Sequence, residues 1–198
     1  MVAVREPGGT SIGEAIRAIL LDPRHQGLTA RAEMLLFAAS RAQLVAEVIV
    51  PALRAGKWVV CDRFLDASLA YQGAGRGLGA DVVRRVNLAA TGGLLPDLTL
   101  LLDIDVPTGL RRARAASPGP GRGDRMEQEQ ESFHERVREG FLSLAQNEPQ
   151  RIRVVDARGT VAAVQREIRQ AVAQALRRRE WGPAGRGPDE ADPRDCSR

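Results

Sequence analysis

Short apolar runs alternate along the chain with longer stretches in which apolar residues recur at every third or fourth position. The short runs are rich in Val, Leu and Ile and are bounded by turn-forming residues, as buried strands are, whereas the longer repeats are typical of helices. This alternation favours a parallel β-sheet and hence an α/β fold. Strands are predicted at residues 2–4, 58–61, 98–104 and 152–155.

Helix boundaries follow from capping residues and from proline. Ser11 and Glu14 form a capping-box pattern that begins the first helix, which should end before Pro23. The longest helix is expected over residues 30–55, with a kink at Pro51. Further helices are predicted at residues 64–72, 81–91, 107–115, 128–146 and 160–179.

The length of 198 residues suits one hydrophobic core and gives no argument for two domains. We therefore expect a single domain over residues 1–180. Residues 117–123 consist of Gly, Pro and Ser apart from Arg122, which predicts a mobile loop within a lid at about 115–127. Residues 181–198 have no periodicity and are expected to form a disordered tail.

Composition narrows the classes of partner. The net charge is +4, and residues 111–127 hold five arginines against two acidic residues, so the excess is local. A nucleic-acid-binding face would spread arginine and interleave aromatic residues, which make up only 4% of this chain. No uninterrupted apolar stretch reaches the about 18 residues of a membrane span, and the start lacks a signal-peptide core. We expect a cytoplasmic protein that binds neither nucleic acid nor membrane.

Cysteine and histidine spacing gives no sign of a disulfide framework or of a metal site built by the protein. Cys61 lies in an apolar run and Cys196 near the end of the chain. His25 and His134 stand far from any Cys-x-x-Cys or His-x-x-x-His pattern.

Charged residues follow three of the predicted strands. They are Asp62 with Arg63, Asp103 with Asp105, and Asp156. Ligands of open α/β sheets bind beyond the carboxyl ends of the strands, so we expect the functional site there.

Two arginines have the positions that most favour ligand binding. Arg41 lies four residues after Phe37 on the apolar stripe of the longest helix, so its guanidinium needs a partner. Arg63 follows a strand, and arginine can grip a phosphate through two parallel hydrogen bonds. Structural explanations stay open for each feature: helix packing for Phe37, an ion pair for Asp62 and Arg63, and a solvated charge run for the arginine-rich loop.

Five segments, covering most of residues 4–176, resemble the bacterial thymidylate kinase family in order and spacing. They are REPGGTSIGEAIRAILLDP, AEMLLFAASRAQ, VIVPALRAGKWVVCDRFLDASLAYQGAGRGL, LPDLTLLLDIDV and DRMEQEQESFHERVREGF. The resemblance implies a P-loop nucleoside-monophosphate-kinase-like parallel sheet with helices on both faces. It also implies transfer of a phosphoryl group from ATP to dTMP, giving dTDP and ADP for dTTP biosynthesis, with Mg²⁺ as cofactor and a homodimer as the assembly.

The resemblance assigns roles to particular residues. Arg63 would hold the dTMP phosphate, Phe37 would stack on thymine, and Arg41 would hydrogen-bond the base. The residues implied in dTMP binding are Glu6, Pro7, Phe37, Arg41, Arg63, Ser68, Tyr71 and Gln72. Those implied in catalysis are Arg63, Asp62, Arg125, Arg122 and Arg112, of which the last three are lid arginines that would cover the transferring phosphoryl group.

One part of the family pattern is not found in the 198 residues, namely the Gly-x-x-x-x-Gly-Lys-Ser/Thr loop that grips the phosphates of ATP. The only lysine, Lys57, is followed by Trp58, and Pro51 stands where the first motif glycine would be. In the family, the strand before this loop lies centrally, between those matching residues 58–61 and 98–104. We therefore expect an N-terminally truncated chain, from a misassigned start or a fragment, whose sheet lacks this first strand and whose activity is impaired. Alternatively, the two neighbouring strands rearrange to meet.

Two other functions stay open. One is a non-catalytic remnant that binds dTMP, and the other is a nucleoside-monophosphate kinase with a different base preference. An in-frame loop encoded upstream of Met1 would favour the enzyme, whereas a stop codon there would favour the remnant. Preference for dTMP over dUMP, dGMP and AMP would exclude the kinase with a different base preference.

Overall fold

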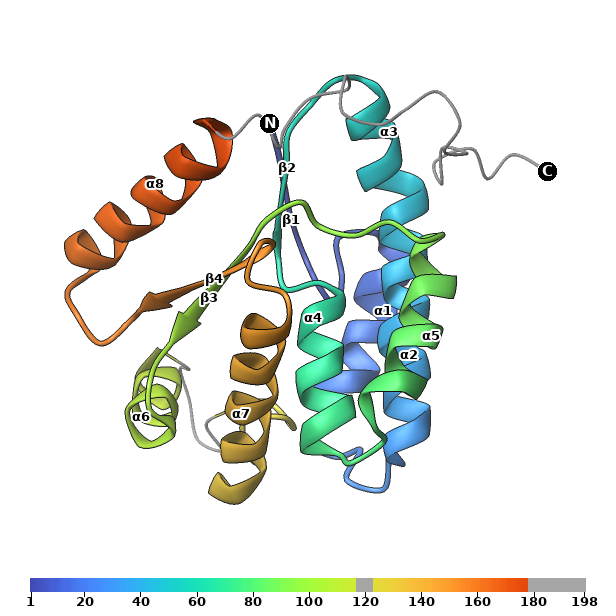
Figure 1. Cartoon of the computed structure of the whole chain (residues 1–198). Coiled ribbons are helices and arrows are strands. Elements are labelled where there is room, and N and C mark those ends of the chain that lie inside the picture. Colours follow the sequence, from blue (N-terminus) through green and yellow to red (C-terminus); the bar gives the residue numbers. More distant parts are fainter. Residues whose placement is uncertain (117–122, 178–198) are drawn as a thin grey trace.

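The computed structural model describes residues 1–116 and 123–177, and its strands run parallel in two pairs (Figure 1). The first strand pairs with the second and the third with the fourth. The predicted strands are confirmed, with boundaries that differ by one residue. They are β1 (Val2–Arg5), β2 (Val59–Asp62), β3 (Thr99–Asp103) and β4 (Ile152–Asp156).

Charged residues stand side by side at the carboxyl end of each strand pair. Arg5 is the register partner of Asp62, and Asp103 is the partner of Asp156. Pairing continues past β1, where the Glu6 backbone N–H donates to the carbonyl of Asp62 at 2.9 Å. The parallel register thus brings Glu6 and the Asp62–Arg63 pair to one edge of the sheet.

The strands form two separate two-stranded sheets and not one continuous sheet. Within the described residues, β2 and β3 do not pair, so these two strands have not rearranged to meet. A groove separates them, lined by residues 58–64, by residues 93–106, and by Val172 and Leu176 of α8 (Val161–Arg177). We call it the β2–β3 groove. Each of these strands has a partner on one side only, so its other backbone edge faces the groove.

The first helix, α1 (Ser11–Leu21), is capped by a neighbour of the predicted residue. Thr10 Oγ1 accepts a hydrogen bond from the Gly13 N–H at 2.9 Å, so Thr10 and not Ser11 is the N-cap. Glu14 completes the cap, because its Oε1 accepts from the Gly9 N–H at 2.9 Å. The helix ends before Pro23, as predicted.

The longest helix is continuous from α2 (Ala30–Leu44) through η1 (Val45–Ile49) to α3 (Val50–Arg54). The η1 segment is a π-helical turn that directly precedes Pro51. Proline lacks an N–H, and its ring clashes with the carbonyl four residues earlier, so widening the preceding turn accommodates it. The predicted irregularity therefore lies one turn before Pro51.

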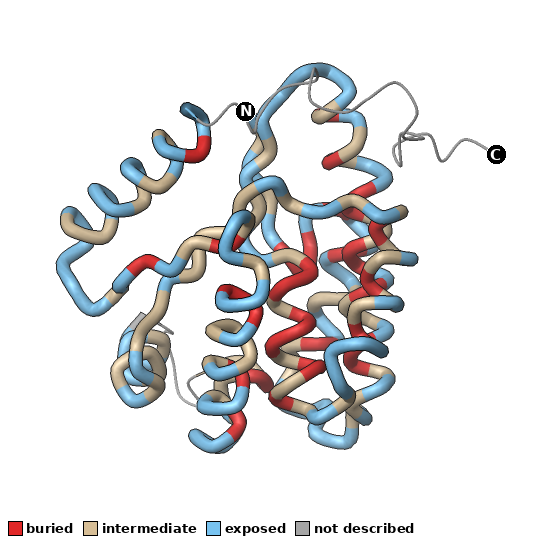
Figure 2. The backbone as a smooth tube through the Cα atoms, in the orientation of Figure 1, coloured by how far each residue is buried: buried red, intermediate tan, exposed pale blue. Residues whose placement is uncertain are grey.

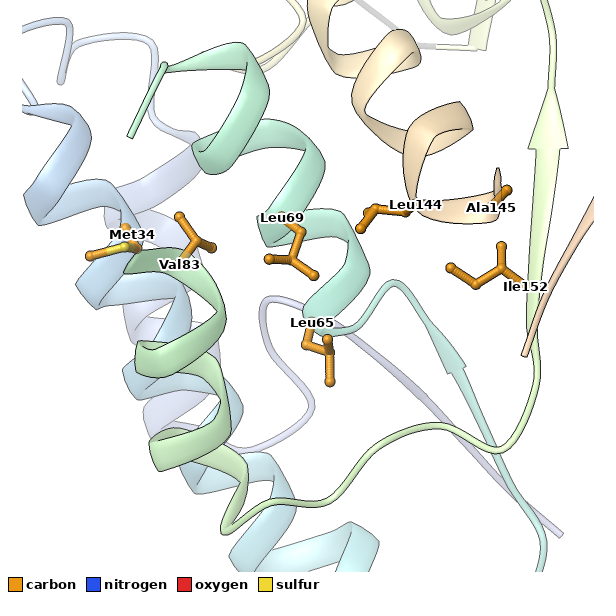
Figure 3. Packing of buried hydrophobic residues seen from close by; sticks show 7 residues of the cluster. All are labelled: Met34, Leu65, Leu69, Val83, Leu144, Ala145 and Ile152. Atoms are coloured by element: carbon orange, nitrogen blue, oxygen red, sulfur yellow. The ribbon is translucent and has the colours of Figure 1, made fainter. Parts of the chain in front are cut away.

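The core is built where this helix meets α4 (Leu65–Ser68), η2 (Leu69–Gly75), α5 (Ala80–Thr91) and α7 (Glu131–Asn147). Figure 2 shows the buried residues gathered on these inner helices. Two glycines let η2 and α7 approach closely: a Cβ at Gly75 would lie 2.7 Å from Val137 Cγ2, and one at Gly140 would lie 2.8 Å from Ala74 Cβ. The main cluster, drawn in Figure 3, comprises Met34, Leu65, Leu69, Val83, Leu144, Ala145 and Ile152.

Helices cover the strands less completely than the expected fold would require. The helix α6 (Val106–Ala116) follows β3, and α8 packs against β4. Val60 of β2, Leu102 of β3 and Val154 of β4 nevertheless remain 56%, 48% and 51% exposed. Within the described residues, one face of these strands is therefore partly exposed.

A buried ion pair ties α4 to the β3–β4 sheet. Arg151 donates from Nη2 to Asp66 Oδ1 and from Nη1 to Asp66 Oδ2, both at 2.7 Å. The side chains are 13% and 6% exposed, and Thr99 Oγ1 also donates to Asp66 Oδ2 at 2.8 Å. This pair links the helical body to the second sheet and lies outside the pocket described below.

The helix Ala30–Arg54 is long and apolar enough, by length and composition alone, to cross a membrane. The expectation concerned uninterrupted apolar stretches, and Glu33, Arg41 and Glu47 interrupt this helix. The helix packs against α1 and α5 and carries Glu33 and Arg41, which are 0% and 1% exposed and pair with other segments. These are properties of a core helix. The predicted tail at 181–198 and most of the predicted mobile loop, with Arg122, lie outside the described residues.

Candidate functional site

A pocket opens at the carboxyl end of the β1–β2 sheet, where the sequence predicted a site. Its hollow of about 650 Å³ includes space that is open to solvent. The β1–α1 turn, α1, α2, η2 and the segment before α7 all contribute to its walls. The lining residues are Glu6, Pro7, Arg17, Leu21, Phe37, Arg41, Arg63, Ala67, Ser68, Tyr71, Gln72, Asp124, Met126, Glu127 and His134.

All eight residues predicted to bind the substrate line this one pocket. They come from three segments far apart in sequence, which the parallel strands and the helix Ala30–Arg54 bring together. Of the further residues predicted for catalysis, Asp62 lines the β2–β3 groove instead, at the carboxyl end of β2. Arg112 and Arg125 line neither hollow.

Arg41 has the partner that its buried position requires. Its Nε lies 2.7 Å from Glu6 Oε2, and its Nη2 donates to Ser68 Oγ at 3.0 Å. Its Nη1 donates to Oδ1 of Asn87, on α5. The guanidinium is therefore fixed from three sides at the inner wall of the pocket, and its carbon also lies 5.6 Å from the centre of the Phe64 ring.

Glu6 reaches the pocket with one carboxylate oxygen still unsatisfied. The residue is 4% exposed, and its Oε1 is buried without a hydrogen-bond partner among the described residues. Burial raises the pKa of the Glu6 carboxyl, and the neighbouring Arg41 guanidinium opposes this rise only in part. A buried acceptor without a partner is costly, so a donor on a bound molecule would satisfy it.

Arg63 stands at the mouth of the pocket in an unusual backbone conformation. Its φ of 66° makes it the one non-glycine residue with positive φ in the described part of the chain. Strained conformations of this kind cluster at ligand sites. The exposed guanidinium lies over the Tyr71 ring, 5.2 Å from the ring centre. The aromatic face orients the cation at the pocket mouth.

Two aromatic residues form apolar walls. Phe37 projects from α2 and is half-buried, while Tyr71 projects from the π-helical segment η2. Tyr71 is held edge-on by Phe133 and Phe141 of α7, with ring centres 6.1 and 6.2 Å away. π-Helical turns are frequent at functional sites, because the extra residue re-aims side chains toward a ligand.

The described lid arginines point away from the pocket. Arg112 is exposed on α6 and donates to the carbonyls of Ala157 and Arg158 at 2.8 and 3.2 Å. Arg125 is 3% exposed; its Nε donates to the Leu20 carbonyl at 2.8 Å, and its Nη2 lies 2.7 Å from Glu33 Oε2. In this arrangement neither guanidinium faces the space beside Arg63.

Several pocket residues were not singled out from the sequence. Arg17 donates to the Pro7 carbonyl at 2.8 Å, and Met126 and Glu127 close one side of the pocket. His134 lies at the pocket with a buried Nε2 that has no hydrogen-bond partner in the described part of the chain, and burial lowers the pKa of its imidazole. Asn87, which holds Arg41, could have been found as a polar residue one helical turn after buried Val83.

The described residues contain no group of three or more His, Cys, Asp or Glu side chains that could hold a metal ion. A magnesium ion bound to phosphates needs only one or two protein carboxylates. Asp62 fits that need, because it is exposed at the end of β2 and lines the groove. Asp103, at the end of β3, is instead engaged by Arg138 through hydrogen bonds of 2.7 and 2.8 Å.

The sequence profile described as thymidylate kinase matches residues 1–168. The chain is 51% identical over 191 residues to a thymidylate kinase of Desulfovibrio desulfuricans, covering 95% of this chain and 86% of that protein. It is 53% identical over 168 residues to one of Methylococcus capsulatus, covering 85% and 78%. With one of Latilactobacillus sakei it shares 49% identity over 175 residues, covering 88% and 81%.

Proposed function

Because the chain belongs to the thymidylate kinase family, whose members are phosphoryl-transferring enzymes, we propose that its pocket binds dTMP as phosphoryl acceptor and ATP is the donor. The products are dTDP and ADP. The observation that carries the proposal is the convergence of Phe37, Arg41 and Arg63 on one pocket from α2 and from the end of β2. An aromatic wall, a fixed inner guanidinium and a cation oriented by Tyr71 at the mouth match the base and the phosphate of one nucleotide.

Each side chain has a distinct task in this proposal. Phe37 offers a face to the thymine ring, and Arg41, held by Glu6, Ser68 and Asn87, presents a fixed donor to the base. Arg63 binds the 5′-phosphate and keeps its oxygen in line with the donor phosphate. Phosphoryl transfer depends mainly on such positioning and on charge neutralisation, so no covalent enzyme intermediate is required.

When bound, magnesium would balance the negative charge of the donor phosphates. Asp62 is the described carboxylate placed to help hold it, at the strand end between the pocket and the β2–β3 groove. The negative charge of Asp62 also acts on the guanidinium of Arg63, its neighbour at the end of the same strand. We assign Asp62 and Arg63 to the reacting end of the site because both lie at the carboxyl end of β2.

A second proposal concerns the donor side of the site. The two facing strand edges and the apolar lining of the β2–β3 groove suit one further parallel strand. We propose that such a strand fills the groove and leads into the Gly-x-x-x-x-Gly-Lys-Ser/Thr loop, a motif that the 198 residues do not contain. Without that loop, the acceptor half binds dTMP but transfers phosphate poorly. The non-catalytic dTMP-binding remnant is the alternative, and the same missing motif favours it.

The assembly and compartment follow as proposals from the same family. We propose a cytoplasmic homodimer that uses the helix Ala30–Arg54. Leu35 on this helix is 52% exposed and offers an apolar contact to a second copy.

Nucleotide selectivity tests the proposed substrate. By isothermal titration calorimetry, the 198-residue chain should bind dTMP more tightly than dUMP, dGMP or AMP. Arg63 binds the phosphate that all four nucleotides carry, so the preference comes from the contacts of Phe37 and Arg41 with the base. Purines should be rejected most strongly, since Arg41 is fixed and cannot move to admit a larger base. Equal binding of AMP would contradict the thymine assignment and favour a nucleoside-monophosphate kinase of another base preference.

A further inference from the structure

Behind the nucleotide pocket, a single buried carboxylate joins two of its walls. Glu33 on α2 is 0% exposed and does not line the pocket. Its Oε1 accepts from Gln72 Nε2 at 2.9 Å and from Arg76 Nε at 3.1 Å. Its Oε2 accepts from Arg76 Nη2 at 2.9 Å and lies 2.7 Å from Arg125 Nη2. Both oxygens are thus saturated by three side chains from two other segments.

The charges of this cluster balance. Two guanidinium groups share Glu33, and Glu129 Oε1 lies 2.6 Å from Arg76 Nη2, so two carboxylates face two arginines. Burial alone would raise the pKa of the Glu33 carboxyl, but the hydrogen bonds from Arg76, Gln72 and Arg125 lower it below its ordinary value. Glu33 is therefore ionised at neutral pH. Removing its charge would leave two partly or fully buried arginines underneutralised.

The cluster connects two stretches of pocket wall that are distant in sequence. Gln72 belongs to η2 and Arg76 caps the carboxyl end of that segment; Gln72 itself lines the pocket. Arg125 belongs to the segment 123–130, in which its neighbours Asp124 and Met126 line the pocket. Arg125 also anchors that segment to the end of α1, through its backbone N–H to the Leu21 carbonyl at 3.0 Å.

We propose that Glu33 is a positioning residue for the acceptor nucleotide: it fixes Gln72 on one wall and, through Arg125, the 123–130 segment on the other. The proposal rests on the proposed function, since the nucleotide is taken to be dTMP. It also gives Arg125 a task different from the catalytic one expected from the sequence. Arg125 holds the pocket wall in place and does not reach the transferring group.

The Glu33→Gln variant tests this role, because glutamine keeps the shape of the side chain and removes its charge. Loosening the two walls should weaken dTMP binding about tenfold, although Glu33 does not touch the ligand. Arg125→Met frees only the 123–130 wall and should weaken binding by a smaller factor. The double variant should bind no more weakly than Glu33→Gln alone, because Arg125 acts through Glu33. Glu33→Asp, which retains the charge, should recover part of the affinity.

The control separates positioning from general destabilisation. Asp66→Asn breaks another buried ion pair, with Arg151, that lies outside the pocket. Its thermal stability should fall while its dTMP affinity stays at the wild-type value. An equal loss of dTMP affinity in Asp66→Asn and Glu33→Gln would overturn the proposal, as would wild-type affinity in Glu33→Gln.

Hydrogen exchange measured without nucleotide keeps the proposal separate from the substrate assignment. Glu33→Gln should speed amide exchange in residues 69–76 and 123–130 relative to α8 in the same protein. Unchanged exchange in both segments would overturn the positioning role whichever nucleotide binds. If wild type fails to bind dTMP while exchange changes as expected, the proposed substrate fails and the role of Glu33 in ordering the pocket stands.

Discussion

Arg63→Ala is expected to raise the dissociation constant of dTMP by about 10- to 150-fold, because hydrogen bonds to charged groups contribute about 1.5 to 3 kcal/mol. Arg63 lines the mouth of the pocket, and the face of Tyr71 orients its guanidinium there. Alanine removes the one cation assigned to the 5′-phosphate without touching the base side. Isothermal titration calorimetry on the 198-residue chain measures the change directly.

Thymidine provides the matched ligand control for Arg63→Ala, because it has the same base and sugar and no phosphate. Its affinity should be the same in wild type and variant. Arg24→Ala provides the matched protein control, since Arg24 pairs with Asp22 on the surface outside the pocket and loses the same charge. If Arg63→Ala weakens thymidine and dTMP equally, or weakens neither, then Arg63 does not bind the phosphate.

Arg41→Met is expected to lower the free energy of unfolding by about 3 to 5 kcal/mol at neutral pH, because it leaves a buried carboxylate without its partner. Arg41 and Glu6 have side chains only 1% and 3% exposed, and their atoms lie 2.7 Å apart. Methionine fills much of the same volume, so the loss reflects charge more than packing. Urea unfolding followed by circular dichroism gives the value.

The pH dependence of this variant has a definite sign. Burial raises the pKa of Glu6, and removing Arg41 removes an interaction that lowers it, so the folded-state pKa rises further. A carboxyl with a raised folded pKa stabilises the fold most when protonated, and this contribution is lost as the pH rises through that pKa. The loss of unfolding free energy in Arg41→Met should therefore be largest at neutral pH. It should be smaller near pH 4, which is approximately the pKa of glutamate in the unfolded chain.

A companion variant decides whether the buried charge is the cause. Adding Glu6→Gln to Arg41→Met removes the unpaired carboxylate and should recover part of the lost stability at neutral pH. A double variant that is no more stable than Arg41→Met would contradict this explanation. So would a loss of less than about 1 kcal/mol in Arg41→Met, since breaking a buried ion pair costs more than that.

The strands and helices could be predicted from the sequence because their signals are local. Apolar runs placed all four strands within a residue, and the charges after them marked the edge at which the pocket lies. The start of α7 was placed too early. Asp124 Oδ1 accepts from the Met126 and Glu127 N–H groups at 2.8 and 2.9 Å, which holds residues 124–127 in a turn before the helix begins.

The partners of buried charges could not be predicted, because they are distant in sequence. The position of Arg41 on an apolar stripe showed that it needed a partner, but Glu6 is 35 residues away and Asn87 is 46. Arg125 stood in an arginine-rich segment and was expected at the transferring phosphate. Its burial depends on Glu33, a residue on another helix with no local signal in the sequence.

The most direct test of the central claim is the rate at which dTMP becomes dTDP in the presence of ATP and Mg²⁺. It should be compared between the 198-residue chain and the same chain extended at its start by a β-strand and a Gly-x-x-x-x-Gly-Lys-Ser/Thr loop. We predict slow or no turnover for the first and ready turnover for the second, with dTMP preferred over AMP as acceptor. Absence of dTDP formation by the correctly folded extended chain, or equal use of AMP, would contradict the account.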